Sequence, residues 1–253
     1  MKVCVLASGS KGNSAYVETN TTKSLIDIGM SCAYTEKSLQ SIGVDPNDIE
    51  RIFITHAHKD HIGGLRVFLK KYNPVVYLTE KILEEIDFDI ENVCFINEEM
   101  YVGNLLVTPI KTSHDTLDSN GYILTEDDRS LVYITDTGYI HMKNFQKLKN
   151  RDMYVLESNH DVEMLMKGNY PYHLKQRILS DRGHLSNKDS SYYLSKFSGN
   201  KTKHIILAHL SEENNDPDVA LKTLYKAFNK DGKDVPDVIV ARQKESTGLI
   251  EVW

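Results

Sequence analysis

Four side chains that can hold metal ions lie close together in the run Thr55-His56-Ala57-His58-Lys59-Asp60-His61. The run follows residues 51–54, whose apolar character predicts a buried strand, and it leads into 61–72, whose pattern predicts a helix ending before Pro74. Alternate residues of an extended segment point the same way, so His56 and His58 can converge on one ion. Asp60 and His61 can then reach a second ion from the turn into the helix. The fold must therefore fix a strand-to-helix junction that leaves room for ions.

Short strand-like runs alternate with helical patterns along the whole chain. Strands are expected at 3–7, 15–18, 24–28, 51–54, 75–78, 93–96, 105–112, 122–125, 131–135, 153–156, 204–208 and 248–252. Helices are expected at 34–42, 61–72, within 161–182, at 186–197 and at 217–229. Hairpins combined with helices on a mixed sheet predict an α/β (α+β) fold with two sheets sandwiched between helices. We expect one domain over residues 1–253.

The charge balance argues against a protein that grips nucleic acid with its whole surface. The 253 residues carry a formal net charge of −6, with a pI near 5.9, whereas such proteins are usually basic. Any polyanion must be held by a local patch or by bound metal. The cysteines, Cys4, Cys32 and Cys94, are odd in number and far apart, which disfavours a disulfide framework and suits a reducing, cytoplasmic setting. No apolar stretch approaches the ~18–20 residues of a membrane helix.

The ligand types indicate a metal-dependent hydrolase. Imidazole and carboxylate are good ligands for Zn²⁺, Mn²⁺ and Fe²⁺, and two-metal hydrolases hold their ions about 3.5–4 Å apart. Gly63 and Gly64 beside the run carry no side chains that would block a substrate. A histidine-rich surface loop is the alternative, and the position of the run at a strand-to-helix junction disfavours it.

The pattern His-x-His-x-Asp-His after a buried strand resembles the signature of the metallo-β-lactamase superfamily. The other superfamily motifs are matched in chain order by Asp27 in Leu25-Ile26-Asp27-Ile28-Gly29, His114 in Thr112-Ser113-His114-Asp115, Asp136 in Ile134-Thr135-Asp136-Thr137-Gly138 and His209 in Ile205-Ile206-Leu207-Ala208-His209. This resemblance extends from residue 3 to about residue 211. It implies the four-layer αββα metallo-β-lactamase sandwich.

The same resemblance implies two divalent metal ions, Zn²⁺ or Mn²⁺ with Fe²⁺ also possible. One ion would be held by His56, His58 and His114, and the other by Asp60, His61 and His209. Asp136 would bridge the two ions, and Asp27 would orient a ligand by a hydrogen bond. Taken alone, Asp27 and Asp136 could be plain turn residues, and His114 an ordinary loop histidine. His204 competes with His209 at the other end of one strand, and we prefer His209 because it follows the apolar run.

Two cations bridged by a carboxylate would lower the pKa of a trapped water, and the resulting metal-bridging hydroxide would attack phosphorus or an acyl carbon. We expect Asp60 to be catalytic as well as a ligand. The segment Asp181-Arg182-Gly183-His184-Leu185-Ser186 resembles the Gly-His-Ser segment of tRNA-processing members, in which the histidine assists near the scissile phosphate. His184 would then be a general acid or a donor to the phosphate. The alternative is that His184 only caps or packs at a helix start.

Three basic residues are candidate substrate contacts: Lys175, Arg177 and Arg182. With the aromatic residues of 168–177 they could hold phosphates and stack bases, although a solvated amphipathic helix would look similar. The Gly/Ser segment 8–14 could bind an anion, but we favour an ordinary hairpin turn. Glu157 and His160 could enter the site or anchor the following helix, and both stay outside the predicted ligand set.

Several segments together resemble the YycJ/WalJ branch of bacterial metallo-β-lactamase proteins: 6–14, 135–139, 157–161, 183–187 and 208–215. That branch implies a 5′-to-3′ DNA exonuclease linked to repair, with DNA ends as substrate. We see no room for an inserted cap domain and no Gly/Pro-rich arm, so structured RNA is less expected. A hydrolase of a small thioester, lactone or cyclic phosphodiester is the first alternative, and it would need a small closed pocket. The second is a non-catalytic, metal-binding regulatory protein, although structural zinc sites are usually closed.

Overall fold

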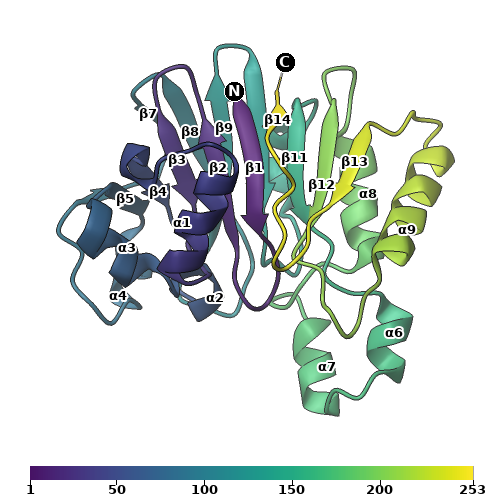
Figure 1. The fold of residues 1–253 in the computed structure, drawn as a ribbon. Coiled ribbons are helices and arrows are strands. Elements are labelled where there is room, and N and C mark those ends of the chain that lie inside the picture. The colour runs from purple at the N-terminus through teal and green to yellow at the C-terminus, as the bar shows by residue number, and fades with distance from the viewer. Residues whose placement is uncertain (253) are drawn as a thin grey trace.

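Two mixed β-sheets pack face to face in the computed structural model, which describes residues 1–252 (Figure 1). Within that range each sheet has seven strands. The first sheet runs in the order β14 (Ile250–Glu251), β1 (Lys2–Ala7), β2 (Ser14–Glu18), β3 (Lys23–Ile26), β4 (Arg51–Phe53), β5 (Val75–Leu78) and β6 (Val93–Phe95). The second runs in the order β13 (Asp237–Val240), β12 (His204–Ala208), β11 (Met153–Glu157), β10 (Arg129–Ile134), β9 (Asn120–Glu126), β8 (Leu105–Lys111) and β7 (Met100–Val102).

Helices cover the outer faces of both sheets (Figure 1). The first half of the chain contributes α1 (Cys32–Ser41), η1 (Pro46–Asp48), α2 (Lys59–Ile62), α3 (Leu65–Tyr72) and α4 (Glu80–Glu84). The second half contributes η2 (Met142–Asn144), α5 (Phe145–Leu148), α6 (Val162–Lys167), α7 (Tyr172–Ile178), α8 (Asn187–Phe197) and α9 (Pro217–Lys230).

Three apolar clusters show where the layers meet. One, which includes Phe53 and Tyr122, contains residues of both sheets and fills the space between them. Another joins the first sheet to its helices through residues such as Phe68 of α3. The third joins the second sheet to α8 and α9, with Leu194 and Phe228 fully buried. Burial of each such side chain contributes about 1.5–3 kcal/mol. The predicted helix–sheet–sheet–helix sandwich is therefore confirmed.

The strand directions bring several loops to one edge of the sandwich. In the first sheet β3 is parallel to β4, and in the second sheet β10, β11 and β12 are parallel to one another. Strand β9 is antiparallel to both β8 and β10, so β8 also runs in the direction of β10. The residues that follow these strands consequently gather at the same edge, and they include most of the side chains that the sequence marks for metal binding.

The helix expected at 61–72 was wrong in extent, because the chain breaks it into α2 and α3 at Gly63 and Gly64. A Cβ at Gly64 would lie 2.2 Å from Met30 O, so the backbone passes too close there for any side chain. The Gly64 N–H instead donates to Ile28 O at 2.8 Å. Strands β7 and β13 were not expected from the sequence. Among the described residues, no helix is both long and apolar enough to cross a membrane.

Candidate metal centre

Asp27 organises the loop that carries the histidine run. It lies just after β3 and is fully buried, and its Oδ1 accepts a hydrogen bond from the Thr55 N–H at 2.8 Å. Its Oδ2 accepts from Thr55 Oγ1 at 2.8 Å and lies 2.8 Å from His61 Nδ1. These contacts fix the His61 ring so that Nε2 points away from Asp27. This is the geometry expected of a residue that orients a metal ligand.

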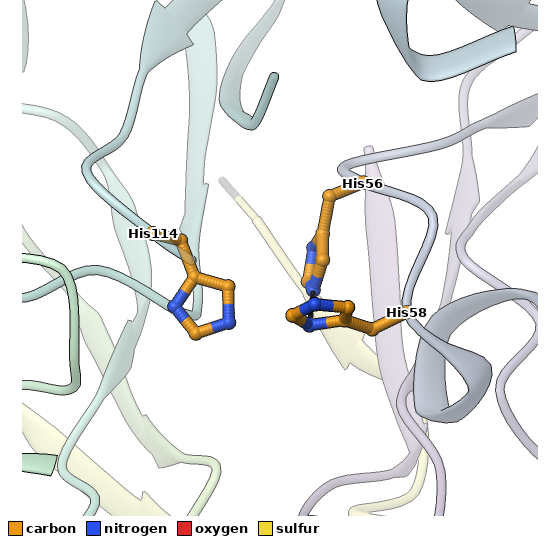
Figure 2. Close-up of side chains that lie close together, drawn as sticks. All are labelled: His56, His58 and His114. Carbon is orange, nitrogen blue, oxygen red and sulfur yellow. Dashed lines mark hydrogen bonds between the residues drawn. The ribbon is translucent and has the colours of Figure 1, made fainter. Parts of the chain in front are cut away.

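A first group of possible ligands consists of His56, His58 and His114, whose ligand atoms lie within 4.8 Å of one another. His56 Nε2 lies 3.1 Å from His58 Nδ1. Figure 2 shows the His114 ring approaching these two rings from the opposite side. His114 Nδ1 lies 3.2 Å from Gly183 O, which leaves Nε2 for the group. His58 Nε2 lies 3.2 Å from Asp115 O, which leaves Nδ1 for the group.

A second group consists of Asp60, His61, Asp136 and His209. His61 Nε2 lies 3.0 Å from Asp136 Oδ2 and 3.6 Å from Asp60 Oδ2. The other Asp136 oxygen, Oδ1, lies 3.8 Å from His114 Nε2 in the first group. The Asp136 carboxylate therefore stands between the two groups, where a bridging ligand would have to be.

Glu157, at the end of β11, belongs to the same cluster and was left outside the predicted ligand set. Its side chain is fully buried, and its Oε1 lies 2.7 Å from His184 Nδ1 and 2.9 Å from His209 Nδ1. Its Oε2 accepts from the Thr137 N–H at 3.0 Å. The available signal was its position, because β11 lies between β10 and β12, the strands that precede Asp136 and His209.

The electrostatics of the cluster fit bound cations. Burial lowers the pKa of the His56 ring well below its usual value. Burial also opposes protonation of His209, but the carboxylates of Asp136, Asp60 and Glu157 outweigh it and raise its pKa to about 10. Among the described residues His209 Nε2 is buried without a hydrogen-bond partner. Several buried carboxylates together are costly unless they are paired or hold metal, and divalent cations would supply the missing positive charge.

Backbone strain is concentrated at the same place. Among residues 1–252, six residues other than glycine have positive φ, and three of them are site residues: Asp27 (φ 60°), Asp136 (φ 53°) and His209 (φ 56°). Each lies directly after a strand or within two residues of its end. A left-handed conformation is uncommon for a residue with a side chain and often marks a functional site. Here it turns each side chain from the strand towards the cluster.

The loop 8–14 is more than the ordinary hairpin turn that we favoured, because it contacts residues of the second ligand group. Ser8 Oγ accepts from the His209 N–H at 2.7 Å. The Asn13 N–H donates to Asp60 O at 2.7 Å, and its side-chain Nδ2 lies 3.0 Å from His61 Nε2. A Cβ on Gly29 would lie 1.6 Å from Asp60 O, so only glycine allows this packing. The loop thus supports the second ligand group directly.

A cavity of about 290 Å³ opens onto the cluster, and its lining includes Arg177, Arg182 and His184. Arg182 also donates to His114 O at 3.2 Å and to Thr116 O at 3.1 Å. Lys175 is not in this lining; its Nζ donates instead to Met166 O at 2.8 Å and Gly168 O at 2.7 Å.

Two histidines that competed for a place in the site lie elsewhere. His204 begins β12, at the end of the strand away from His209, and faces Asp237. His160 is buried beside Ser186, and its ring belongs to neither ligand group. Asp161 caps the start of α6 by accepting from the Glu163 and Met164 N–H groups.

The two sheets lie between helices, and histidines and carboxylates gather at one edge of the strands. This arrangement defines a class of metal-binding proteins, and the comparison with known families finds the same class. A family model described as the metallo-β-lactamase superfamily matches residues 7–144. This chain belongs to the metallo-β-lactamase superfamily, as the resemblance of its motifs predicted.

Within that superfamily the chain is similar over most of its length to the exodeoxyribonuclease WalJ of Streptococcus pneumoniae serotype 2 (strain D39). The two are 40% identical over 232 residues, which cover 88% of this chain and 86% of the relative. The exodeoxyribonuclease YycJ of Bacillus anthracis is 38% identical over 235 residues, or 90% of this chain and 89% of the relative. The predicted resemblance to this branch is confirmed.

Solved structures agree on the fold. The metallo-β-lactamase fold protein YhfI from Bacillus subtilis matches with a TM-score of 0.74 and 16% identity over 97% of each chain. The short form of human tRNase Z matches with a TM-score of 0.69 and 15% identity over 100% of each chain.

Proposed function

We propose that this protein is a dinuclear, metal-dependent phosphodiesterase that degrades DNA from its ends as a 5′-to-3′ exonuclease. The observation that carries the hydrolase part is the pair of neighbouring ligand groups, with Asp136 of the second group facing His114 of the first, beside one open cavity. The choice of DNA is supported by the two relatives named as exodeoxyribonucleases. We further propose that residues 1–253 act as one domain, because each ligand group draws on both sheets.

When bound, two divalent cations would lower the pKa of a water molecule and offset the negative charge that develops on the attacked phosphate. The ligands proposed are those the motifs predicted: His56, His58 and His114 for one ion, Asp60, His61 and His209 for the other, and Asp136 between them. The side chain of Asp60 is 23% exposed, so its carboxylate faces the cavity and can orient the attacking water by accepting a hydrogen bond. Zn²⁺ and Mn²⁺ are our candidates, with Fe²⁺ third.

His184 is the group we propose as general acid. Glu157 Oε1, 2.7 Å from His184 Nδ1, holds the ring in its orientation. The side chain is 21% exposed at the cavity, so Nε2 is available to give a proton to the leaving oxygen. Asp27 orients the His61 ring through the contact between its Oδ2 and His61 Nδ1. The cellular setting we propose is DNA repair in the cytoplasm. The repair role rests on the resemblance to the YycJ/WalJ branch, and the cytoplasmic setting rests on the three free cysteines.

The test follows the release of label from the 5′ end of single-stranded and double-stranded DNA, with Mn²⁺ or Zn²⁺ added. The wild-type protein is compared with the Asp60→Ala, His61→Ala double variant and with a matched control, His204→Ala. His204 is a histidine of the second sheet, at the end of β12 away from His209, and it lies outside the cluster. We expect 5′ nucleotides to be released by the wild type and by the control, and not by the double variant.

Each other result has a definite meaning. Retained activity in the double variant would exclude the two-metal mechanism. Metal-dependent hydrolysis of a small phosphodiester or thioester without cleavage of DNA would favour the small-metabolite alternative. Tight binding of one non-exchangeable metal without any hydrolysis would favour the regulatory alternative.

A further inference from the structure

The helix α7 lies beside the cavity and does not pack its side chains into a hydrophobic core. Figure 1 shows α6 and α7 projecting together from the body of the sandwich. In the described part of the chain, none of the side chains of α7 is buried. A helix normally gains its stability by burying an apolar face, so the apolar residues of α7 need another explanation.

Polar and backbone contacts hold α7 in position instead. Lys175 Nζ links α7 to the end of α6 by donating hydrogen bonds to Met166 O and Gly168 O. The His184 N–H donates to Ile178 O at 3.0 Å. At Gly183 a Cβ would lie 2.1 Å from Ile178 O, so the segment packs directly against the helix end. Because these contacts fix the backbone, the apolar side chains of α7 stay available on the side that faces the cavity.

That side forms one wall of the cavity. Leu174 and Ile178 are four residues apart on α7 and therefore share one face. They line the cavity together with Tyr170, which precedes the helix, and with Arg177. The same cavity is lined by Asp60, Asp136 and His209, so one bound molecule can touch the apolar wall and the metal centre at once.

From this wall we infer a nucleobase subsite, in which the base of the terminal nucleotide packs on Tyr170, Leu174 and Ile178 while its phosphodiester lies at the metal centre. The inference rests on the proposed function. Aromatic side chains stack on any base, since every base has a π-face, and cationic groups such as Arg177 suit the neighbouring phosphates. Arg177 pairs with Asp115 at 2.9 Å, but its side chain is 59% exposed, so a phosphate can reach it.

The cavity is open to solvent, and its volume of about 290 Å³ lies at the lower end of the range for small-molecule sites. A volume of this size suits one nucleotide as the occupant. Because stacking on Tyr170 would use the π-face that every base has, we expect little preference among the four bases.

The experiment compares Tyr170→Ala with Tyr172→Ala. Tyr172 lies two residues further on, is 66% exposed and is absent from the cavity lining, so it is a matched control. Both variants are assayed with Mn²⁺ on a single-stranded oligonucleotide with a normal 5′ nucleotide and on one with an abasic 5′ unit. On the normal end we expect Tyr170→Ala to raise KM about 5- to 140-fold, equivalent to about 1–3 kcal/mol for stacking one base. We expect no such rise for Tyr172→Ala or Tyr170→Phe.

The abasic end separates stacking from a general structural defect. If Tyr170 holds the base, Tyr170→Ala changes KM less than about 2-fold on the abasic end. A rise in KM of equal size on both ends, or no rise on the normal end, would refute the nucleobase subsite. An independent readout uses a 5′-terminal 2-aminopurine in an oligonucleotide protected by phosphorothioate linkages. Its fluorescence should be quenched on binding to the wild type and to Tyr172→Ala, and not on binding to Tyr170→Ala.

Failure of the proposed function gives a different pattern. In that case the wild type cuts neither oligonucleotide and does not quench the 2-aminopurine signal, and both proposals fall. If the wild type cuts DNA while the Tyr170 and Tyr172 variants behave alike, the exonuclease proposal stands and only the nucleobase subsite is refuted.

Discussion

Replacing Asp27 by asparagine should weaken metal binding without removing an atom from the core. The carbonyl oxygen of the new side-chain amide would still accept from the Thr55 N–H, so the amide nitrogen would take the place of Oδ2. That nitrogen donates hydrogen bonds, so His61 Nδ1, 2.8 Å away, would have to accept. The ring proton would then move to His61 Nε2, the atom that lies 3.0 Å from Asp136 and that must be unprotonated to bind metal.

The expected magnitude follows from these contacts. Loss of a partner that orients a metal ligand typically costs 10- to 100-fold in metal affinity, which is about 1.4–2.7 kcal/mol. Asparagine tolerates the positive φ of this position, so no further backbone strain is expected. High Mn²⁺ concentrations should partly restore DNA cleavage.

The assay is a calorimetric Mn²⁺ titration, with the bound metal counted by mass spectrometry. The matched control is Asp152→Asn. Asp152 is 3% exposed and accepts from the Ser130 N–H at 2.9 Å and from Ser130 Oγ at 2.6 Å. These are the same two kinds of donor that Thr55 offers to Asp27, but they lie at the end of the second sheet away from the metal centre. The reasoning is refuted if Asp27→Asn binds two ions with wild-type affinity, or if Asp152→Asn loses metal to the same extent.

Three further results are expected. Glu157→Gln should lower kcat about 10-fold or more on DNA, and less on a p-nitrophenyl nucleotide ester whose leaving group needs no acid; equal losses on both would argue against Glu157 acting through His184. Lys71 and Tyr72 lower the pKa of Glu36 to about 2, below the ordinary value of about 4.3, so the stability that these contacts provide should be complete above about pH 4.3 and be lost as the pH falls towards 2. In urea unfolding, the free energies of unfolding of Glu36→Gln and the wild type should therefore converge over that pH range, and a constant difference would contradict this. Removal of metal by a chelator should lower the melting temperature, and Mn²⁺ at 100 times its Kd should restore about 2.7 kcal/mol for each site; an unchanged melting curve in calorimetry would speak against bound ions.

The sequence located the cluster because its ligands follow strands. The histidine run comes after β4, Asp136 after β10 and His209 after β12. An apolar run that ends in a polar residue can be read from the sequence alone, and the carboxyl ends of parallel strands meet at one sheet edge. Local patterning and the order of motifs were therefore enough to predict the layers of the fold and to place these side chains together.

The supporting contacts could not be predicted in this way, because they join segments that are far apart in the chain. Asn13 and His61 are separated by 48 residues, and Ser8 and His209 by 201. A Gly/Ser loop carries no signal of the partner it will pack against. The substrate contact expected of Lys175 stays a prediction. In the structure its Nζ donates to Met166 O, one of the last carbonyls of α6, and to Gly168 O just after the helix, because the last carbonyls of a helix lack partners within it.

The placement of the two ligand groups also explains why metal binding should stabilise the fold as well as serve catalysis. His56 and His58 follow a strand of the first sheet, while His114 follows a strand of the second. The second group divides likewise, with Asp60 and His61 on one side and Asp136 and His209 on the other. Each ion would therefore join the two sheets at the edge where they present buried carboxylates and strained backbone to each other. Strain and charge that would weaken an empty edge become part of a preorganised site once the cations are bound.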